Sequence, residues 1–148
     1  MENKSIDELN SVLKGEEMAV QAYERYLKDI HDNNVKEKFQ SIQQDHKRHA
    51  SDISTRIQDL GGQPNYGTGI SGVMANAKLA FQDAINNDTL HILKQAYDGE
   101  DKGIAMVEEI IKGDLDKDSM NLVNGIMSTD HQHLRDLAKM ISDYELKQ

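Results

Sequence analysis

The sequence contains no cysteine, no tryptophan and only one proline, Pro64. Without cysteine, the chain can form neither disulfides nor thiolate zinc sites nor iron–sulfur clusters. Proline breaks helices, so its scarcity, together with a charged fraction of 29%, favours helices over strands. The sequence therefore predicts an all-α fold in which any metal ion is bound by histidine, aspartate and glutamate.

Basic residues and long apolar runs are also scarce. The chain has 17 Lys and Arg against 26 Asp and Glu, and its net charge of -9 repels nucleic acid and anionic lipid. No apolar run approaches the roughly 18 residues of a membrane span, and residues 1–5 lack the apolar core of a signal peptide. We therefore expect a cytoplasmic protein without nucleic acid or membrane partners, folded as a single domain over residues 1–148.

Four segments carry apolar residues at spacings of three and four, which predicts a bundle of four long helices. They cover residues 5–30, 35–60, 88–113 and 116–144. Between the second and third, residues 61–72 predict a loop and residues 73–85 a short extra helix. Such a crossover is long enough for the second and third long helices to run parallel.

Two of the helix ends have recognisable signals. Ser5 is followed three residues later by Glu8, which indicates a capped start of the first helix. Gly61 and Gly62 follow Leu60, which indicates that the second helix stops there. The sequence therefore predicts that the first helix begins near Ser5 and that the second ends at Leu60.

Polar residues interrupt the apolar face of each long helix near its middle. Those of the second helix, His46 and His49, are three residues apart and therefore share one face. The full set is Glu16, His46, His49, Glu100, Asp130 and His133. Glu16 precedes His46 by 30 residues, just as Glu100 precedes Asp130. Two helix pairs with one plan predict a pseudo-twofold bundle whose polar residues meet at one level.

Imidazole and carboxylate ligands in one layer suit iron, manganese or zinc. Leaving three carboxylates and three histidines in a core without a metal costs several kcal/mol for each unpaired ion. A satisfied network of carboxylates and imidazoles could offset that cost, and a lone Glu16 or Glu100 could simply set the helix register. Metal binding is the leading interpretation, and the network is its alternative.

The residues next to this layer can be interpreted in more than one way. Tyr23 and Tyr97 lie near it on apolar faces, either as hydrogen-bond donors or as plain core residues. Asp45 adjoins His46 but points about 100° away from it, so we expect it on a solvated face. His31, His91 and His131 are expected at the surface.

Four short motifs resemble those of the ferritin-like superfamily, which includes the rubrerythrins. They are Gly15-Glu16 with Tyr23 two turns on, Lys47-Arg48-His49-Ala50, Gly99-Glu100 and Asp130-x-x-His133. More narrowly, the chain is similar to small bacterial ferritin-like proteins assigned to a domain of unknown function, over nearly its whole length. The resemblance implies a ferritin-like four-helix bundle with a di-iron centre, and a homodimer.

The resemblance also implies roles for the six residues. Glu16 and Glu100 would be terminal carboxylate ligands and His49 and His133 the imidazole ligands. His46 and Asp130 occupy the positions of two bridging glutamates, and His46 departs from the family because it cannot bridge as a carboxylate does. Three carboxylates leave one positive charge uncompensated against two divalent ions, which favours a single ion or an unequal pair.

Three functions follow from these observations. The leading one, which rests on the resemblance, is an iron-dependent oxidoreductase in which bound Fe(II) reacts with O2 or peroxide. The second is a protein that binds zinc or manganese without turnover, for storage or stability. The third is an interaction bundle without a metal, in which the polar layer is a hydrogen-bonded network.

Overall fold

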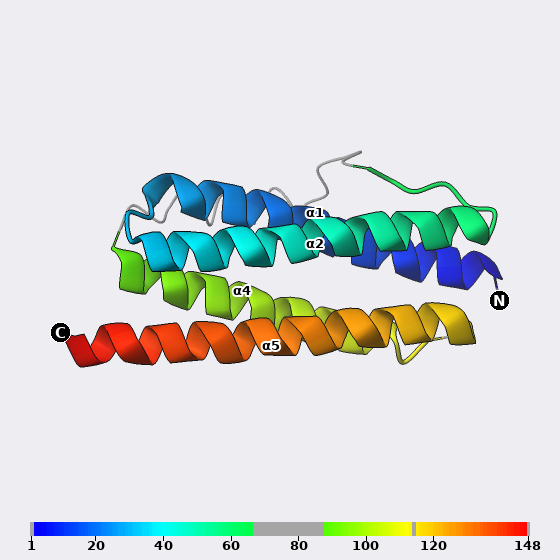
Figure 1. Ribbon diagram of the computed structural model, residues 1–148. Helices are drawn as coiled ribbons and strands as arrows, with labels where there is room; N and C mark the ends of the chain where they lie inside the picture. Colours follow the sequence, from blue (N-terminus) through cyan, green and yellow to red (C-terminus); the bar gives the residue numbers. More distant parts are fainter. Residues whose placement is uncertain (1, 67–87, 114, 148) are drawn as a thin grey trace.

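The structure is a computed structural model that describes residues 2–66, 88–113 and 115–147. Four long helices make up most of these residues. They are α1 (Glu2–Asp29), α2 (Asn33–Asp59), α4 (Thr89–Ile110) and α5 (Lys117–Lys147), as Figure 1 shows. The predicted all-α, four-helix bundle is thus confirmed. The short helix predicted for residues 73–85 and most of the preceding loop lie outside the described residues.

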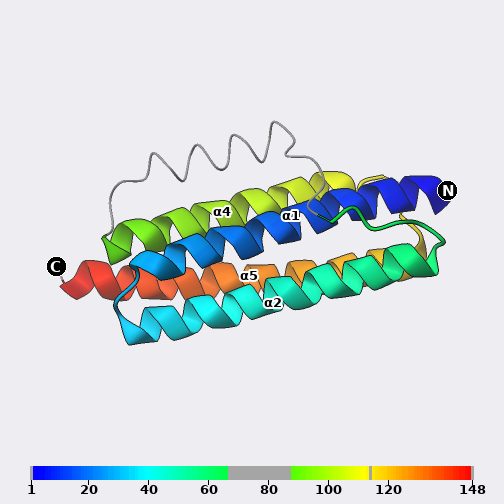
Figure 2. The same cartoon turned by 90° about the horizontal axis from the view of Figure 1, so that it is seen from above.

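Neighbouring helices in the bundle are antiparallel. α1 packs against α2 and α4, and α5 packs against the same two helices. In both views of the ribbon, α2 and α4 run in the same direction, so the connection between them joins opposite ends of the bundle (Figures 1 and 2). The parallel arrangement predicted for these two helices is therefore confirmed. The four helices therefore enclose one core, in which α1 packs most closely with α2 and α4 most closely with α5.

The ends of α2 follow local rules that the sequence contains. Its start is capped by Asp32, whose carboxylate accepts the backbone N–H groups of Asn34 and Val35 at 2.8 and 3.2 Å. It stops at Gly61, whose φ of 83° lies in the left-handed region that favours glycine. The N–H of Gly62 then donates to the carbonyl of Ile57 at 2.9 Å. The predicted end of the second helix is confirmed.

The start of α1 differs from the prediction. The helix begins at Glu2, and Ser5 is a fully buried residue inside it rather than its cap. The hydroxyl oxygen of Ser5 accepts the backbone N–H of Asp116 at 3.1 Å. The Asp116 carboxylate in turn binds Arg56 at 2.7 Å. The prediction that Ser5 caps the first helix was wrong. The capping signal considers only nearby residues, whereas the hydroxyl of Ser5 bonds to Asp116, 111 residues away at the start of α5.

The core consists of two apolar clusters, one toward each end of the bundle. The first contains Tyr23, Tyr26, Ile30, Val35, Phe39, Ile42, Ile92, Leu93, Ala96 and Leu137. The second contains Leu9, Val12, Leu13, Ile53, Ile57, Val107, Val123 and Ile126. Along α2, His46 and His49 fall between the residues of the first cluster and those of the second. The polar layer is therefore sealed from water at both ends by packed side chains.

The outer faces of the helices are largely polar. Among the described residues, the exposed large hydrophobic side chains are Tyr66, Met106 and Leu146. None of the described helices contains an apolar stretch long enough to cross a membrane. The apolar surface of the described helices is thus mostly buried in the two core clusters.

Phe39 is the largest fully buried side chain, and it packs edge-on against Tyr23 at 5.2 Å between ring centroids. We expect Phe39→Ala to lower the free energy of unfolding by about 3–5 kcal/mol, because it leaves a cavity in the first cluster. The control is Leu146→Ala, at a side chain that is 83% exposed, which should change stability by less than about 0.5 kcal/mol. Urea unfolding measures both, and equal effects of the two substitutions would contradict the described core.

Candidate metal centre

The six polar side chains singled out in the sequence meet in one buried layer. Glu16 comes from α1, His46 and His49 from α2, Glu100 from α4, and Asp130 and His133 from α5. Their exposed fractions lie between 3% and 6%. They reach this layer because positions three and four apart on each helix share the inward face. The helices thus place all six side chains inside the bundle, as the geometric part of the prediction requires.

The possible ligand atoms fall into two groups that share His46. Glu16, His46 and His49 form the first group, and His46, Glu100, Asp130 and His133 form the second. Within each group, one ligand atom from every residue lies within 4.8 Å of the others. A cation placed among such atoms can contact all of them after small side-chain rotations, so these residues could hold a metal ion.

His46 is hydrogen-bonded through both ring nitrogens. Its Nδ1 lies 2.6 Å from Glu16 Oε2, and its Nε2 lies 2.7 Å from Glu100 Oε1. An ionised carboxylate only accepts hydrogen bonds, so both nitrogens of His46 donate and the ring is an imidazolium. Burial alone would lower the pKa of His46, but the bonds to Glu100 and Glu16 outweigh it and hold this pKa well above its ordinary value.

The pKa values of Glu16 and Glu100 are shifted in the opposite direction, downward. Burial alone would raise their pKa values, but their histidine partners outweigh burial in both cases. His46 and His49 lower the pKa of Glu16, while His133 and His46 lower that of Glu100 to about 2. Both glutamates are therefore ionised at neutral pH. Together with the His46 imidazolium they leave one negative charge.

Asp130 behaves differently from the glutamates. Its pKa is raised to about 7, first because it is buried and then because Glu16 and Glu100 are nearby. Its Oδ1 has no hydrogen-bond partner among the described residues. The two nearest histidine nitrogens, Nδ1 of His133 and Nδ1 of His49, lie 3.5 and 3.9 Å away. The Asp130 carboxyl is thus close to imidazole groups without being bonded to them.

Three buried ligand atoms of the layer make no hydrogen bond of good geometry in the described structure: His49 Nδ1, Asp130 Oδ1 and His133 Nδ1. The two nitrogens have only longer contacts to carboxylates, His49 Nδ1 at 3.5 Å from Glu16 Oε2 and His133 Nδ1 at 3.4 Å from Glu100 Oε1. Leaving a buried polar atom unbonded costs about 1–3 kcal/mol. Hydrogen bonds therefore satisfy His46 but not the whole layer. A divalent cation bound by these atoms would remove the cost, so the donor set fits a metal ion and argues against a fully satisfied network.

Asp45 corrects one prediction. It was expected on a solvated face, yet its Oδ2 accepts a hydrogen bond from His133 Nε2 at 2.8 Å, and its Oδ1 binds Arg48 at 2.6 Å. Because Nε2 bonds to Asp45, Nδ1 faces the layer, 3.4 Å from Glu100 Oε1. Sequence reasoning missed this contact because it joins α2 to α5 across 88 positions. The one available signal was an acidic residue directly before His46.

Tyr23 is both a core residue and a hydrogen-bond donor. Its hydroxyl donates to Glu100 Oε1 at 2.8 Å, and its ring stacks on His46 at 5.8 Å between centroids. Burial and the charge of Glu100 raise its pKa well above the ordinary value, so the hydroxyl keeps its proton. Tyr97 instead packs against the first apolar cluster, partly buried. His31 and His131 are exposed, as expected, whereas His91 is half-buried.

These pKa shifts make the metal-free protein sensitive to alkali. His46 and Asp130 bind protons more tightly in the folded state, so their contributions to stability are lost as pH rises through their raised pKa values, that of Asp130 being about 7. The contribution of Glu100 is lost only as pH falls toward about 2. We expect the urea midpoint of metal-free protein to fall between about pH 5 and about pH 9.

Asp130→Asn is the matched control for this experiment. It removes the titrating carboxyl, so the fall in the urea midpoint should become smaller between about pH 5 and about pH 7. A metal-free parent that is more stable at the alkaline end would contradict the assigned charge states.

Three comparisons place the chain among known proteins. No curated protein matches it. A solved two-domain protein from Anabaena variabilis, with a DJ-1/ThiJ/PfpI-like and a ferritin-like domain, matches at a TM-score of 0.84 and 20% identity. The match covers 97% of this chain, which spans only 40% of that protein.

The second structure is a dodecameric thioferritin from Bacteroides fragilis, described as related to bacterioferritin. It matches at a TM-score of 0.81 and 20% identity, over 99% of this chain and 89% of that one. At this identity both structures establish the fold, which is that of a ferritin-like four-helix bundle. The model of the family named Domain of unknown function (DUF2383) matches residues 4–113. The chain therefore belongs to the DUF2383 family and has the ferritin-like fold.

Proposed function

We propose that this chain binds divalent metal ions, with iron as the principal ion, through Glu16, His46, His49, Glu100, Asp130 and His133. The observation that carries the proposal is the set of three buried ligand atoms that make no hydrogen bond of good geometry in the described structure. They belong to residues from two helices, and they face two carboxylates that remain ionised. Buried nitrogen and oxygen atoms with free lone pairs, next to buried carboxylates, are the arrangement that a cation stabilises.

The proposed centre has two unequal positions. The first group contains one carboxylate, Glu16, whereas the second contains two, Glu100 and Asp130. His46 presents Nδ1 to the first group and Nε2 to the second. Since a carboxylate contributes more charge than an imidazole, we expect the second group to bind its ion more tightly. A symmetric pair with two carboxylate bridges does not fit, because His46 stands at one bridging position.

Bound Fe(II) would supply one-electron chemistry toward O2 or peroxide. The chain's own residues would prepare the site for it. Tyr23 holds the Glu100 carboxylate through its hydroxyl, and Asp45 holds His133 with Nδ1 directed into the layer. The His46 imidazolium carries a proton on each ring nitrogen, and that proton has to leave before the nitrogen can bind a metal. Metal uptake should therefore release protons.

Binding of zinc or manganese without turnover is the second candidate. It is favoured by the replacement of a bridging carboxylate with His46, because imidazole is a good zinc ligand and zinc needs no bridge. Oxidation of added Fe(II) in air, compared with buffer, separates the two functions. A protein that binds zinc but does not accelerate this oxidation belongs to the second class.

The oligomeric state of this chain is the next part of the proposal. The relative from Bacteroides fragilis is described as dodecameric, and we propose that this chain also self-associates. The homodimer and the single domain over residues 1–148 remain predictions, as does cytoplasmic localisation. The oligomeric state is measured by sedimentation of metal-free and metal-loaded protein.

Removing metal should destabilise the protein, because an ion that binds only the folded state stabilises it by mass action. At a free metal concentration near 100 times the Kd, the gain is about 2.7 kcal/mol and the thermal midpoint should rise by about 5–10 °C. Elemental analysis of protein made without a histidine tag gives the metal content. We expect His133→Ala to lose both the metal and the stabilisation.

His131→Ala is the matched control, since it removes an exposed histidine two positions from His133. It should bind metal as the parent does. If parent protein with verified metal removal melted at the same temperature as the loaded form, the satisfied network would be the better explanation.

The departure at His46 can be tested directly. His46→Glu restores a carboxylate at the bridging position and brings the number of carboxylates to four, so the variant should bind two ferrous ions more evenly and oxidise Fe(II) faster. Metal stoichiometry and the initial rate of Fe(II) oxidation in air are the measurements. Stability must be followed in parallel because glutamate and imidazole differ in shape. Folded variant with the parent's stoichiometry, affinities and rate would refute the assigned role of His46.

A further inference from the structure

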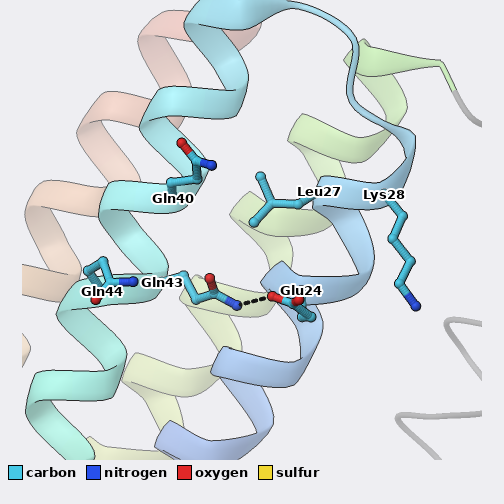
Figure 3. Close-up of a pocket in the computed structure, with 6 residues that line it drawn as sticks. All are labelled: Glu24, Leu27, Lys28, Gln40, Gln43 and Gln44. Carbon is cyan, nitrogen blue, oxygen red and sulfur yellow. Dashed lines mark hydrogen bonds between the residues drawn. The ribbon is translucent and has the colours of Figure 1, made fainter.

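Gln43 lies one turn before His46 and fixes α2 against α1. Its amide group donates to Glu24 Oε2 and to the carbonyl of Val20, at 2.9 and 3.0 Å. Figure 3 shows Gln43 pointing toward Glu24 in the wall of a depression of about 580 Å3. Because both amide hydrogens are used within the protein, Gln43 holds the two helices at a set distance beside the polar layer.

The ring of His46 is held in place by three other rings. It stacks on Tyr23 at 5.8 Å between centroids, and it meets His133 and His49 edge-on at 5.2 and 5.7 Å. Only 3% of His46 is exposed. Since closely packed side chains have little room to rotate, each ring nitrogen stays directed at its own glutamate.

One imidazole ring offers a metal only one lone pair at a time. A neutral ring has a lone pair on one nitrogen and a hydrogen on the other, whereas a carboxylate has lone pairs on both oxygens. Once one nitrogen of His46 binds an ion, the other nitrogen therefore keeps its hydrogen and its bond to a glutamate. The choice of nitrogen decides whether Glu16 or Glu100 keeps this hydrogen bond.

Two features of the second group favour binding through Nε2. It contains two carboxylates, Glu100 and Asp130, which match the charge of a divalent ion, whereas the first group contains only Glu16. Glu100 also accepts a hydrogen bond from the hydroxyl of Tyr23 at 2.8 Å. This bond does not depend on the hydrogen that Nε2 of His46 loses. Binding through Nε2 thus leaves both glutamates hydrogen-bonded.

We propose that, when the chain holds one divalent ion, Glu16 acts as a positioning residue for His46 and is not a ligand of that ion. In this state Nδ1 of His46 donates to Glu16, and Nε2 binds the ion together with the other three residues of the second group. The proton that Nε2 carried passes to solvent, and Nδ1 keeps its own. The inference deepens the proposed function and rests on it, because the ion lies in the second group of that centre.

Nuclear magnetic resonance of the full chain with isotope-labelled histidine tests the proposal on the parent protein, with Zn(II) as the probe. The chemical shifts of ring nitrogens distinguish a nitrogen that carries a hydrogen from one that binds a metal. At one equivalent of Zn(II), we expect Nε2 of His46 to be metal-bound and Nδ1 to carry a hydrogen. A second ion would find only His49 and an already bonded Glu16, so calorimetry should show it binding at least about tenfold more weakly.

Matched substitutions of the two glutamates separate a positioning residue from a ligand. Glu100→Gln removes a charged ligand and should weaken Zn(II) binding at least about 100-fold. Glu16→Gln should weaken it by less than about tenfold, because the amide oxygen still accepts the hydrogen of His46. Glu16→Ala leaves that hydrogen unbonded and should weaken binding by about 10–100-fold. The lost charge does not explain the better binding of Glu16→Gln, since both variants lack it.

Ligation of His46 through Nδ1, ligation of both its nitrogens, or two ions of equal affinity would overturn this inference and leave the metal centre standing. Equal losses of affinity in folded Glu16→Gln and Glu100→Gln would do the same. A parent that binds neither Zn(II) nor Fe(II) would refute the proposed centre itself, and this inference with it. If Glu16→Gln fails to fold, the ring nitrogens of the parent protein decide alone.

Discussion

The contact on which the bundle depends is the buried imidazolium of His46 between Glu16 and Glu100. It joins α1, α2 and α4 at one level, with all three side chains at most 6% exposed. An unpaired carboxylate at this depth would cost several kcal/mol, so a shift of any of these helices by one turn would be strongly disfavoured. The polar layer therefore sets the register of helices whose apolar clusters alone would tolerate sliding.

The approximate twofold repetition of the chain is broken by the partners of the layer. Asp45, before His46, bonds to His133, whereas Thr129, at the equivalent place before Asp130, donates to the carbonyl of Gly125 in its own helix. The hydroxyl of Tyr23 likewise bonds to Glu100. Both supporting bonds therefore fall on the second group of possible ligands. The extra hydrogen bonds thus support the same group of ligands that, with two carboxylates, is expected to bind its metal ion more tightly.

The elements that could be predicted from the sequence are those governed by short-range spacing. Apolar periodicity gave four helices, Gly61 gave the end of α2, and the spacing of 30 residues placed His46 and Asp130 at one depth. The contacts that could not be predicted are those between distant helices. Ser5 bonds to Asp116 because of how α1 meets α5, which no local pattern encodes. Asp45 was assigned to solvent because helical angle alone ignores the neighbouring helix.

The polar layer is closed at both ends of the bundle but can be approached from one side. The two apolar clusters close the ends, whereas a groove between α1 and α4 reaches Glu16, His46, Glu100 and Asp130. His49 and His133 do not line that groove. A molecule that entered through the groove would meet the carboxylates of Glu16, Glu100 and Asp130 before it could reach His49 or His133. Because carboxylates attract cations and repel anions, this order favours entry of metal ions and neutral molecules over anions.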